Sequence, residues 1–481
     1  MIKIENYIDG ELVSNSDNYI DLYNPSIGKK YGQCPNSSIK DLNSSITSSE
    51  NAFNEWSQFS FKKRSSFLFK IADLLENELD DFAKAESLDN GKPLSLSTKL
   101  DIPRAIENLR FFADMVSNSQ SAICKTDKIG DNYILKQPLG IVGTISPWNL
   151  PLYLFTWKIA PALVSGNCVI AKPSEITPLT TYMFSQLCIK AKLPKGVLNI
   201  LHGYGNQIGN EIVKHSSVKA ISFTGGTSTG KKIAVECSKK FKKLNLEMGG
   251  KNPVIIFDDC NYSEMIKSVL KSSFLNQGQI CLSGSRIYVQ NGIYNKFKED
   301  LIDGIKKLNI GNPFDSKSDQ GAIVSKEHLD KIKNYIEISK KEECNILIGG
   351  KVPYINGECS EGWYFEPTLI ENFNDSSKVN QDEIFGPVVT LNSFDNEEDA
   401  LSKANNSEYG LASVIWTENL DRANKIANSI ESGIVWINCW LERDLRTPFG
   451  GIKKSGLGKE GGEYALDFFT ENKNVCVKKY D

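Results

Sequence analysis

The apolar residues in the first third of the chain recur at helical spacing. Between Ser65 and Glu86 they stand three and four residues apart, which is the period of one face of an α-helix. A second stretch of the same kind runs from Ile102 to Val116. The sequence therefore predicts two amphipathic helices, each with one face buried.

After Ile134 short apolar runs alternate with helical segments. Thr177-Pro178 is typical of a helix start, with threonine as the N-cap and proline in the first turn. Because strands and helices alternate here, we expect a parallel sheet with helices on both faces. The predicted strands are Ile141–Ile145, Cys168–Ala171, Val197–Leu201 and Ala220–Phe223.

A second α/β series begins near Leu246. It contains predicted strands at Pro253–Phe257 and Ile287–Val289 and a helix at Ile293–Leu308. The sequence thus predicts an α/β protein of two tandem domains, with a seam near residue 247.

The composition fits a water-soluble protein of two to three domains. The chain has 481 residues, of which 40% are hydrophobic and 24% charged. Its 56 lysines and arginines nearly balance 59 acidic residues, so the net charge of −3 offers no basic field for nucleic acid or an anionic membrane. No uncharged apolar run reaches the ~18 residues of a membrane span, and the first residues lack the apolar core of a signal peptide. We expect a cytoplasmic protein.

The three histidines, His202, His215 and His328, exclude some chemistry. None has the His-x-x-x-His spacing of a zinc site, and no Gly-x-Ser-x-Gly motif suggests a serine triad. We therefore expect no metal site, and carboxylates, lysines and cysteines become the candidates. The 11 cysteines are an odd number without Cys-x-x-Cys pairs, which favours reduced thiols.

The segment from Gly225 to Lys231 comes close to a phosphate-binding loop. Lys232 stands where such a loop needs a serine or threonine to hold magnesium, which disfavours a nucleotide triphosphatase. Two interpretations stay open: a glycine turn that brings a helix N-terminus to a dinucleotide phosphate, or a plain strand-to-helix turn.

Seven short segments are distinctive in their order and spacing. They are Ser146-Pro-Trp-Asn-Leu-Pro151, Lys172-Pro-Ser-Glu175, Phe223-Thr-Gly-Gly226, Leu246-Glu-Met-Gly-Gly-Lys251, Gln277-Gly-Gln-Ile-Cys281, Glu383-Ile-Phe-Gly-Pro387 and Pro448-Phe-Gly-Gly451. Together they resemble the aldehyde dehydrogenase superfamily, and they extend over most of the chain.

The resemblance implies a three-part architecture. Residues 1–118 and 139–247 would form a Rossmann-type NAD-binding domain, and residues 248–450 an α/β catalytic domain. Residues 119–138 and 466–481 would form a small β oligomerisation element, so a homodimer or homotetramer is expected. The apolar alternation from Asn474 to Val477 is also typical of an edge strand that can pair with another chain.

The resemblance assigns the chemistry to three residues. Cys281 would be the nucleophile that forms a thiohemiacetal and then a thioester, Glu247 the general base for hydrolysis, and Asn149 an oxyanion donor beside the backbone N–H of Cys281. The residues themselves agree: Cys281 follows a Gln277-Gly278 loop, whereas Cys168, Cys188 and Cys237 lie in buried-looking patterns.

The resemblance also implies NAD as the cofactor. Lys172 and Glu175 would hold the adenosine ribose, and a carboxylate there would repel the 2′-phosphate of NADP. Gly226 replaces the usual serine of the family, which removes one hydroxyl contact to the pyrophosphate. The remaining cofactor residues would be Ser146, Trp148, Ser174, Phe223, Gly225, Gly230, Glu383 and Phe385.

Three further stretches are similar to the 2-aminomuconic and 2-hydroxymuconic semialdehyde dehydrogenases. The resemblance places Arg104 and Arg443 along the substrate tunnel, where two guanidinium groups would bind a substrate carboxylate. The alternative is a pair of surface arginines bound to Asp101 and to Glu442 or Asp444. The stretches are Asp101-Ile-Pro-Arg104 with Phe111-Phe-Ala113, Leu150 to Ala160, and Asn438-Cys-Trp-Leu-Glu-Arg443.

Other functions remain as alternatives. A broad-specificity or betaine-aldehyde dehydrogenase would share the same catalytic residues. A CoA-acylating relative is disfavoured because it does not need a base at Glu247. A non-catalytic structural protein is disfavoured by the intact set of Cys281, Glu247 and Asn149.

Overall fold

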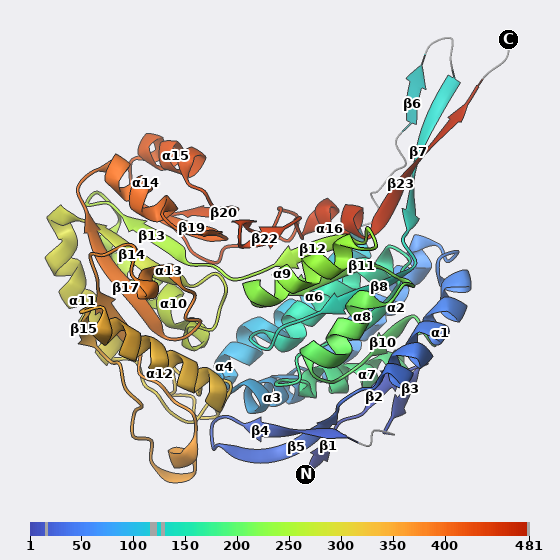
Figure 1. Ribbon diagram of the computed structural model, residues 1–481, viewed down its shortest axis with the longest axis horizontal. Helices are drawn as coiled ribbons and strands as arrows, with labels where there is room; N and C mark the ends of the chain where they lie inside the picture. The colour runs from blue at the N-terminus through green and yellow to red at the C-terminus, as the bar shows by residue number, and fades with distance from the viewer. Residues whose placement is uncertain (15–17, 116–122, 127–129, 479–481) are drawn as a thin grey trace.

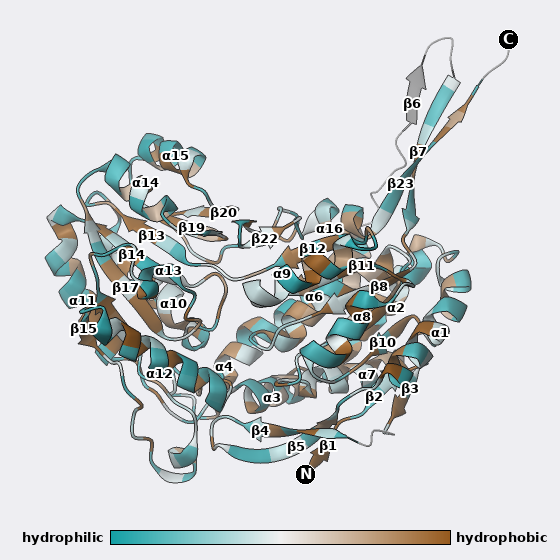
Figure 2. Ribbon diagram, in the orientation of Figure 1, coloured by the Kyte–Doolittle hydropathy of each residue, from teal (hydrophilic) through white to brown (hydrophobic). Residues whose placement is uncertain are grey.

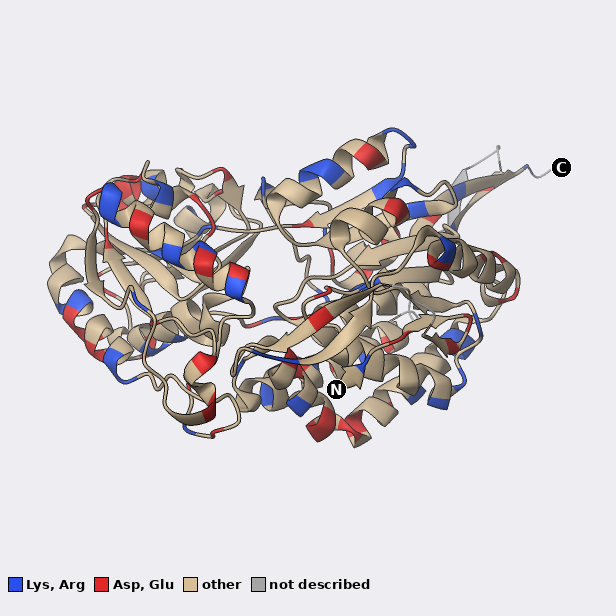
Figure 3. Ribbon diagram, turned by 60° about the horizontal axis from the view of Figure 1, so that its bottom comes forward, with Lys and Arg blue, Asp and Glu red and all other residues tan. Residues whose placement is uncertain are grey.

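The computed structural model describes residues 1–14, 18–115, 123–126 and 130–478, and only the backbone of residues 123–126. The chain forms two α/β lobes, and a narrow β arm projects from one of them (Figure 1). Lysines, arginines and acidic residues are interspersed over both lobes (Figure 3), so the view shows no extended face of one charge.

The first lobe is built on an eight-stranded sheet. Its strands are β2 (Asn6–Ile8), β3 (Glu11–Val13), β8 (Ile141–Ile145), β9 (Cys168–Lys172), β10 (Leu198–Ile200), β11 (Val218–Thr224), β12 (Lys243–Glu247) and β22 (Gly456–Leu457). The five central strands are parallel, in the order β10-β9-β8-β11-β12, and antiparallel strands flank them. This is the strand order of a Rossmann fold, as predicted.

Helices cover both faces of this sheet because each parallel strand is apolar on both sides. Ile141 and Ile145 of β8 pack with one helix layer, whereas Val142 faces the other. The first layer contains α1 (Ile39–Trp56), α8 (Asn210–Lys214) and α9 (Thr227–Ser238). The second contains α2 (Phe61–Asn77), α3 (Leu79–Asn90), α5 (Ile102–Met115), α6 (Pro151–Val164) and α7 (Leu179–Ala191).

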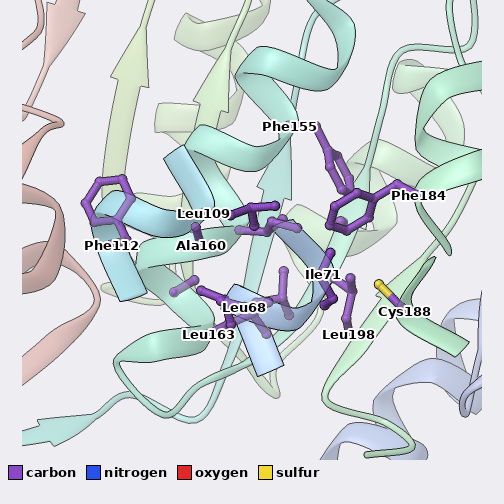
Figure 4. Close-up of a cluster of buried hydrophobic side chains, with 14 of the residues drawn as sticks. Leu68, Ile71, Leu109, Phe112, Phe155, Ala160, Leu163, Phe184, Cys188 and Leu198 are labelled. Carbon is purple, nitrogen blue, oxygen red and sulfur yellow. The ribbon is translucent and has the colours of Figure 1, made fainter. Parts of the chain in front are cut away.

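The second layer forms the largest apolar cluster of the lobe. Figure 4 shows side chains from α2, α5, α6 and α7 meeting there, with the ring of Phe155 edge-on to that of Phe184 at 5.6 Å. Figure 2 shows the same partition, with hydrophobic colour on the central strands and polar colour on the outer helix faces. Smaller elements complete the lobe: α4 (Leu94–Leu96), η1 (Ser97–Asp101), η3 (Gly205–Gly209), α16 (Gly462–Phe468), β1 (Ile2–Lys3), β4 (Tyr19–Asn24) and β5 (Lys29–Pro35).

The second lobe contains a seven-stranded sheet. Its strands are β13 (Asn252–Ile256), β14 (Gly284–Gln290), β15 (Asn345–Ile348), β16 (Thr368–Glu371), β17 (Val388–Phe394), β19 (Ala412–Trp416) and β20 (Ile434–Ile437), parallel except for β15. Its helices are α10 (Tyr262–Phe274), η4 (Leu275–Gly278), η5 (Asn291–Ile293), α11 (Tyr294–Lys306), α12 (Lys326–Lys341), η6 (Gly357–Glu361), α13 (Lys378–Gln381), α14 (Glu397–Asn405) and α15 (Leu420–Ser429). A short pair, β18 (Tyr409–Gly410) and β21 (Ile452–Lys453), lies outside the sheet. The chain passes from one sheet to the other between Glu247 and Asn252.

The arm is a three-stranded antiparallel sheet of β6 (Ile123–Thr126), β7 (Gly130–Pro138) and β23 (Thr470–Val477), in the order β23-β7-β6. It joins two segments more than 300 residues apart that were expected to form one element. Parts of that expectation, residues 119–122, 127–129 and 479–481, lie outside the described residues. Strand β23 is at the edge of this sheet.

Two local predictions were wrong. The helix expected from Ser65 to Glu86 is two helices, α2 and α3, because Glu78 has non-helical dihedral angles (φ −109°, ψ 19°) and its carbonyl starts the second helix. The apolar residues keep their helical spacing across Glu78 because α2 and α3 both bury their apolar residues in the same cluster. Val116, the expected end of α5, lies outside the described residues.

The start of α7 is the second correction. Pro178 and not Thr177 is the N-cap, and no side chain of the cap binds the helix. The hydroxyl of Thr177 donates instead to the carbonyl of Trp148 at 3.2 Å. The carboxylate of Asp89, from α3, accepts the N–H of Leu179 at 2.8 Å, so a distant acid replaces the local cap.

Candidate active site

The candidate site lies where the order of the first sheet reverses. Strands β8 and β11 are neighbours there, and the loops after their carboxyl ends carry Asn149 and the Gly225-Gly226 pair. Ligands of open α/β sheets bind in the crevice at such a point. Fold topology thus brings the oxyanion candidate and the glycine loop together.

A cavity of about 220 Å³ occupies this crevice. Eight of the predicted site residues line it, from both lobes. The lining consists of Pro147, Trp148, Asn149, Leu154, Thr224, Gly225, Gly226, Glu247, Met248, Gly249, Cys281, His328, Lys331, Glu383 and Phe385.

Cys281 is placed in the cavity by an unusual turn. Asn276, Gln277 and Gly278 all have positive φ angles of 52°, 55° and 66°. A Cβ atom on Gly278 would stand 2.2 Å from the carbonyl oxygen of Gly386, so two predicted motifs interlock at a glycine. The carbonyl of Cys281 accepts the amide of Asn252 at 2.7 Å, which fixes its backbone. The thiol therefore has a defined position.

Asn149 approaches Cys281 from the other lobe. Its side chain is 3% exposed, and its Nδ2 donates to the carbonyl of Gln279 at 3.0 Å. An amide nitrogen carries two hydrogens, and Gln279 takes one of them. The second hydrogen is available to an oxygen in the cavity.

Glu247 is the last residue of β12 and lies at the carboxyl end of the first sheet. Its side chain is buried, and neither carboxyl oxygen has a hydrogen-bond partner among the described residues. A Cβ atom on Gly450 would stand 2.4 Å from its Oε1, so the glycine of another motif makes room for this carboxyl. A buried acid without partners is available to a water or a substrate.

Burial and nearby charge set the proton affinity of Glu247. Desolvation raises its pKa well above the ordinary value, and the charge of Glu460 raises it further. Glu460 is paired with the buried Lys158 at 2.7 Å, whose charge acts in the opposite direction. Glu247 is therefore a weaker acid than an exposed glutamate, and an ion or dipole in the site would favour its anion.

The thiol of Cys281 is similarly weakly acidic. Desolvation, followed by the charges of Glu383 and Glu247, raises its pKa to about 12, and the charge of Arg443 lowers it. The thiolate is the nucleophilic form of cysteine. Reaction at Cys281 thus requires a base that takes its proton.

The candidate cofactor residues include two carboxyl groups, those of Glu175 and Glu383. Lys172 donates to Glu175 at 2.7 Å; burial would raise the pKa of Glu175, but the charge and hydrogen bond of Lys172 outweigh it and the pKa is lowered. Glu383 accepts the N–H of Gly250 at 3.0 Å and lies where a Cβ atom of Gly249 would be. Both carboxylates can accept hydroxyl groups.

The glycine loop starts a twelve-residue helix. Gly226 is the N-cap of α9, no side chain caps that helix, and a Cβ atom at Gly226 would meet nothing within 4 Å. The free N–H groups and the positive end of α9 favour a bound phosphate. Thus the dinucleotide interpretation of this loop fits the local geometry.

Known proteins resemble this chain over nearly its whole length. The profile of the "Aldehyde dehydrogenase family" matches residues 12–475. The chain belongs to the aldehyde dehydrogenase family. It is 44% identical to human 2-aminomuconic semialdehyde dehydrogenase and 40% identical to the 2-hydroxymuconic semialdehyde dehydrogenase of Pseudomonas sp. strain CF600, over 99% of this chain and at least 99% of each relative. Staphylococcus aureus betaine aldehyde dehydrogenase, solved in complex with NAD+, is 37% identical, with a TM-score of 0.95 over 98% of this chain and 94% of the other.

Not every predicted residue of this aldehyde dehydrogenase lines the cavity. Phe223 lies in the apolar core beneath the glycine loop, where a Cβ atom on Gly225 would meet its ring at 2.6 Å. Glu175 lines a different cleft of about 1150 Å³, beside Ile176 and Tyr204. The remaining predicted cofactor residues outside the 220 Å³ cavity are buried: Ser146, Lys172, Ser174 and Gly230.

The two arginines are not paired as the surface alternative required. Asp101 bonds Lys92, and Asp444 bonds Arg446. Arg104 lies 3.2 Å from Glu107, and its Nη1 is buried without a partner among the described residues. Arg104 is thus only partly neutralised.

Arg443 lines a groove of about 980 Å³, separate from the 220 Å³ cavity. Its Nη1 donates to the hydroxyl of Tyr153 at 2.6 Å, and its guanidinium stacks on Trp157 and Phe449 at 4.3 and 4.1 Å. Its Nη2 has no partner among the described residues. Phe449 lines the groove, and the next residue, Gly450, touches Glu247.

Sequence reasoning missed His328. Its Nε2 donates to the carbonyl of Phe385 at 2.6 Å, and its ring is edge-on to Trp148 at 5.0 Å. Burial lowers the pKa of His328 to about 4, so the ring is neutral and holds Phe385, whose φ is 61°. A single histidine in a helix gives no sequence signal for such a contact.

Lys459 is a second residue whose place the sequence did not reveal. Its ammonium donates to the carbonyls of Gly450 and Gly451, and its charge lowers the pKa of Glu247. Lys459 thereby fixes the segment at Gly450, which leaves room for the carboxyl group of Glu247.

Among the described residues no cluster of histidine, cysteine and acidic side chains could hold a metal. No helix in that part of the chain is long and apolar enough to cross a membrane.

Proposed function

We propose that the chain is an NAD-dependent aldehyde dehydrogenase in which Cys281 is the nucleophile, Glu247 the general base and Asn149 an oxyanion donor. The observation that carries this proposal is the convergence of these three side chains on one cavity of about 220 Å³, where Glu383 and the start of α9 provide sites for a dinucleotide. The substrate class is a semialdehyde that bears a carboxylate.

The reaction follows from these positions. The ionised form of Glu247, which lines the same cavity, takes the thiol proton of Cys281 and passes it to solvent before the hydrolysis step. The resulting thiolate forms a C–S bond with the aldehyde carbon, and the carbonyl π electrons move to the oxygen. The second N–H of Asn149 and the backbone N–H of Cys281 stabilise that oxyanion; one such donor is worth roughly a hundredfold or more in rate. NAD, when bound, would supply the acceptor for the hydride of this carbon, and the C=O bond would re-form as the C–H bond breaks. A thioester remains on Cys281.

Hydrolysis of the thioester needs a base. Glu247 takes one proton from a water molecule, and the resulting hydroxide attacks the thioester carbon. The C–S bond breaks, the carboxylic acid leaves and the thiolate is restored. The raised pKa of Glu247 places a strong base at this point once its proton has been lost.

The residues fit NAD. The ionised Glu175 would accept the two ribose hydroxyls and repel a 2′-phosphate, so NAD is favoured over NADP. Glu383 would hold the second ribose, and the uncapped end of α9 the pyrophosphate. Gly226 has no side-chain hydroxyl, so backbone N–H groups would make the contact with the pyrophosphate.

The arginines support an anionic substrate. Each guanidinium has a buried nitrogen without a partner among the described residues, which a substrate carboxylate would satisfy. A quaternary ammonium substrate needs open aromatic faces, and Arg443 already covers Trp157 and Phe449. This geometry favours a muconic-type semialdehyde over betaine aldehyde.

Two further properties belong to the proposal. We infer a homodimer or homotetramer, because β23 leaves one edge of the arm sheet unpaired. We also infer a reducing, cytoplasmic location, which the ten free cysteines among the described residues support.

The test is NADH formation with 2-aminomuconic and 2-hydroxymuconic semialdehyde, betaine aldehyde and a neutral aliphatic aldehyde. We expect the highest kcat/KM with a muconic semialdehyde, and no turnover by Cys281→Ala although NAD still binds. Turnover by Cys281→Ala, or the highest kcat/KM with betaine aldehyde, would overturn the respective assignment.

Arg104→Met should raise the KM of the muconic substrate about tenfold or more, the value of a lost charged hydrogen bond, and leave the neutral aldehyde unchanged. Arg110→Met is the matched control on the same helix, because Arg110 is bound to Asp73 and Glu76 at the surface. Equal losses on both aldehydes would contradict a carboxylate contact.

A further inference from the structure

The end of helix α3 reaches under the loop that carries Asn149. Asn90 donates from its Nδ2 to the carbonyl of Trp148 at 2.9 Å, and Lys92 donates from its Nζ to the carbonyl of Asn149 at 2.9 Å. Two side chains, two residues apart, thus bind two consecutive carbonyls. The left-handed Gly91 between them (φ 86°) gives the chain the turn that this arrangement needs.

Lys92 is held in place by acids from two other turns. Its side chain is 0% exposed; its ammonium bonds the carboxylate of Asp101 and lies 3.8 Å from that of Glu86. Thr180 donates its hydroxyl to Glu86 at 2.9 Å. Burial of an ammonium is unfavourable unless charges and carbonyls surround it. The ammonium of Lys92 is therefore stable only in the position where these partners meet it.

The carbonyl that Lys92 binds belongs to Asn149, which lines the same cavity as Cys281. The same carbonyl also accepts the amide of Asn276 at 3.2 Å, and the Nδ2 of Asn149 donates to Gln279 at 3.0 Å. Backbone and side chain of Asn149 are therefore fixed from opposite sides. The direction of its second N–H follows from these bonds.

We propose that Lys92 is a positioning residue that fixes Asn149 so that its free amide N–H points at the oxyanion of the reacting aldehyde. Asp101 acts through Lys92 and keeps the ammonium on the Asn149 carbonyl. Asp101 also ends the turn from which α5 continues to Arg104, so the substrate-binding helix and the oxyanion donor share one anchor. This inference rests on the proposed role of Asn149.

The experiment is a double-mutant cycle between Lys92 and Asn149. Lys92→Met is combined with Asp101→Asn, so that the acid bonded to the ammonium is not left buried without its partner, while Glu86 keeps its hydrogen bond from Thr180. Because a donor displaced by about 1 Å loses roughly a hundredfold in rate, we expect a tenfold to hundredfold fall in kcat/KM with the Kd of NAD changed less than twofold. In an Asn149→Ala background the same pair should cost less than twofold.

Two variants complete the design. Lys92→Gln keeps an N–H donor without a charge and should recover part of the loss. Lys242→Met removes another buried lysine that binds backbone carbonyls, those of Val213 and His215, and should keep full activity with a comparable change in Tm. If the double variant does not fold, Asp101→Asn alone, which keeps Lys92, replaces it in the cycle.

The outcomes separate the two proposals. If the wild-type chain forms no NADH, or Asn149→Ala retains full activity, the proposed function fails. If Asn149→Ala loses activity but the Lys92 pair costs the same factor with and without Asn149, Lys92 acts independently and this inference is overturned. An unchanged kcat/KM in the Lys92 pair overturns it as well.

Discussion

At the scale of single residues, the site holds two weak acids that must both lose a proton in the proposed reaction. Burial raises the pKa of Cys281 to about 12 and that of Glu247 well above its ordinary value. The thiolate and the carboxylate are the reactive forms, so the active fraction is small at low pH and grows as pH rises. We therefore expect kcat/KM to increase from about pH 6 to about pH 9.

Arg443 provides a direct test of this electrostatic argument. Its charge lowers the pKa of both Cys281 and Glu247, so Arg443→Met should raise both pKa values and move the rising limb of the pH profile to higher pH. The assay should use a neutral aldehyde, because such a substrate has no carboxylate for Arg443 to bind. Arg446→Met is the control, since Arg446 is exposed and paired with Asp444. An unmoved profile in Arg443→Met would contradict the charge effect.

At the scale of elements, the motifs of the sequence are the places where segments interlock. Gly450 is against the carboxyl of Glu247, Gly249 against that of Glu383, and Gly278 against the carbonyl of Gly386. These glycines come from separate motifs, and each leaves the space that a side chain of another motif or its backbone requires. Motifs that lie far apart along the chain thus pack together in one site.

Gly450→Ala tests this interlocking. The new Cβ atom would stand 2.4 Å from Glu247 Oε1 at a φ of 144°, so the carboxyl must move. We expect kcat to fall about a hundredfold, as for a misplaced catalytic group, while the Kd of NAD is kept. The control is Gly357→Ala, at a φ of 74° with nothing within 4 Å, which carries backbone strain without a clash. Equal losses in both variants would mean that strain, and not Glu247, is responsible.

Sequence patterns predicted the elements that depend on local periodicity, such as β8, β11 and α5. They failed at Glu78, where burial on the same side of two helices preserves one apolar period across a break. At the site, the motifs predicted a role for residues such as Cys281, which lines the cavity. Lys92 and His328 could not be predicted in this way, because each acts on a carbonyl 57 residues away, and side-chain-to-backbone contacts impose no pattern on the partner.

At the scale of the whole molecule, the arm is the part that we propose to pair with a second chain. It extends away from both lobes, and β23 lies at one edge of its sheet (Figure 1). A three-stranded sheet with an open edge is a ready template for pairing. No residue of β6, β7 or β23 lines the 220 Å³ cavity, so we expect a change in the arm to leave that cavity intact.

Removal of residues 470–481 tests the role of that edge. Light scattering should give two or four times the chain mass of 53.6 kDa for the full protein and the mass of one chain for the truncated form, because β23 is lost. A control that ends at Lys478 keeps β23 and should keep the full assembly. A full-length protein at the mass of one chain, or a truncated form that still assembles, would contradict pairing through β23. The truncated form should still bind NAD, since Lys172, Glu175 and Glu383 lie in the lobes and keep their contacts.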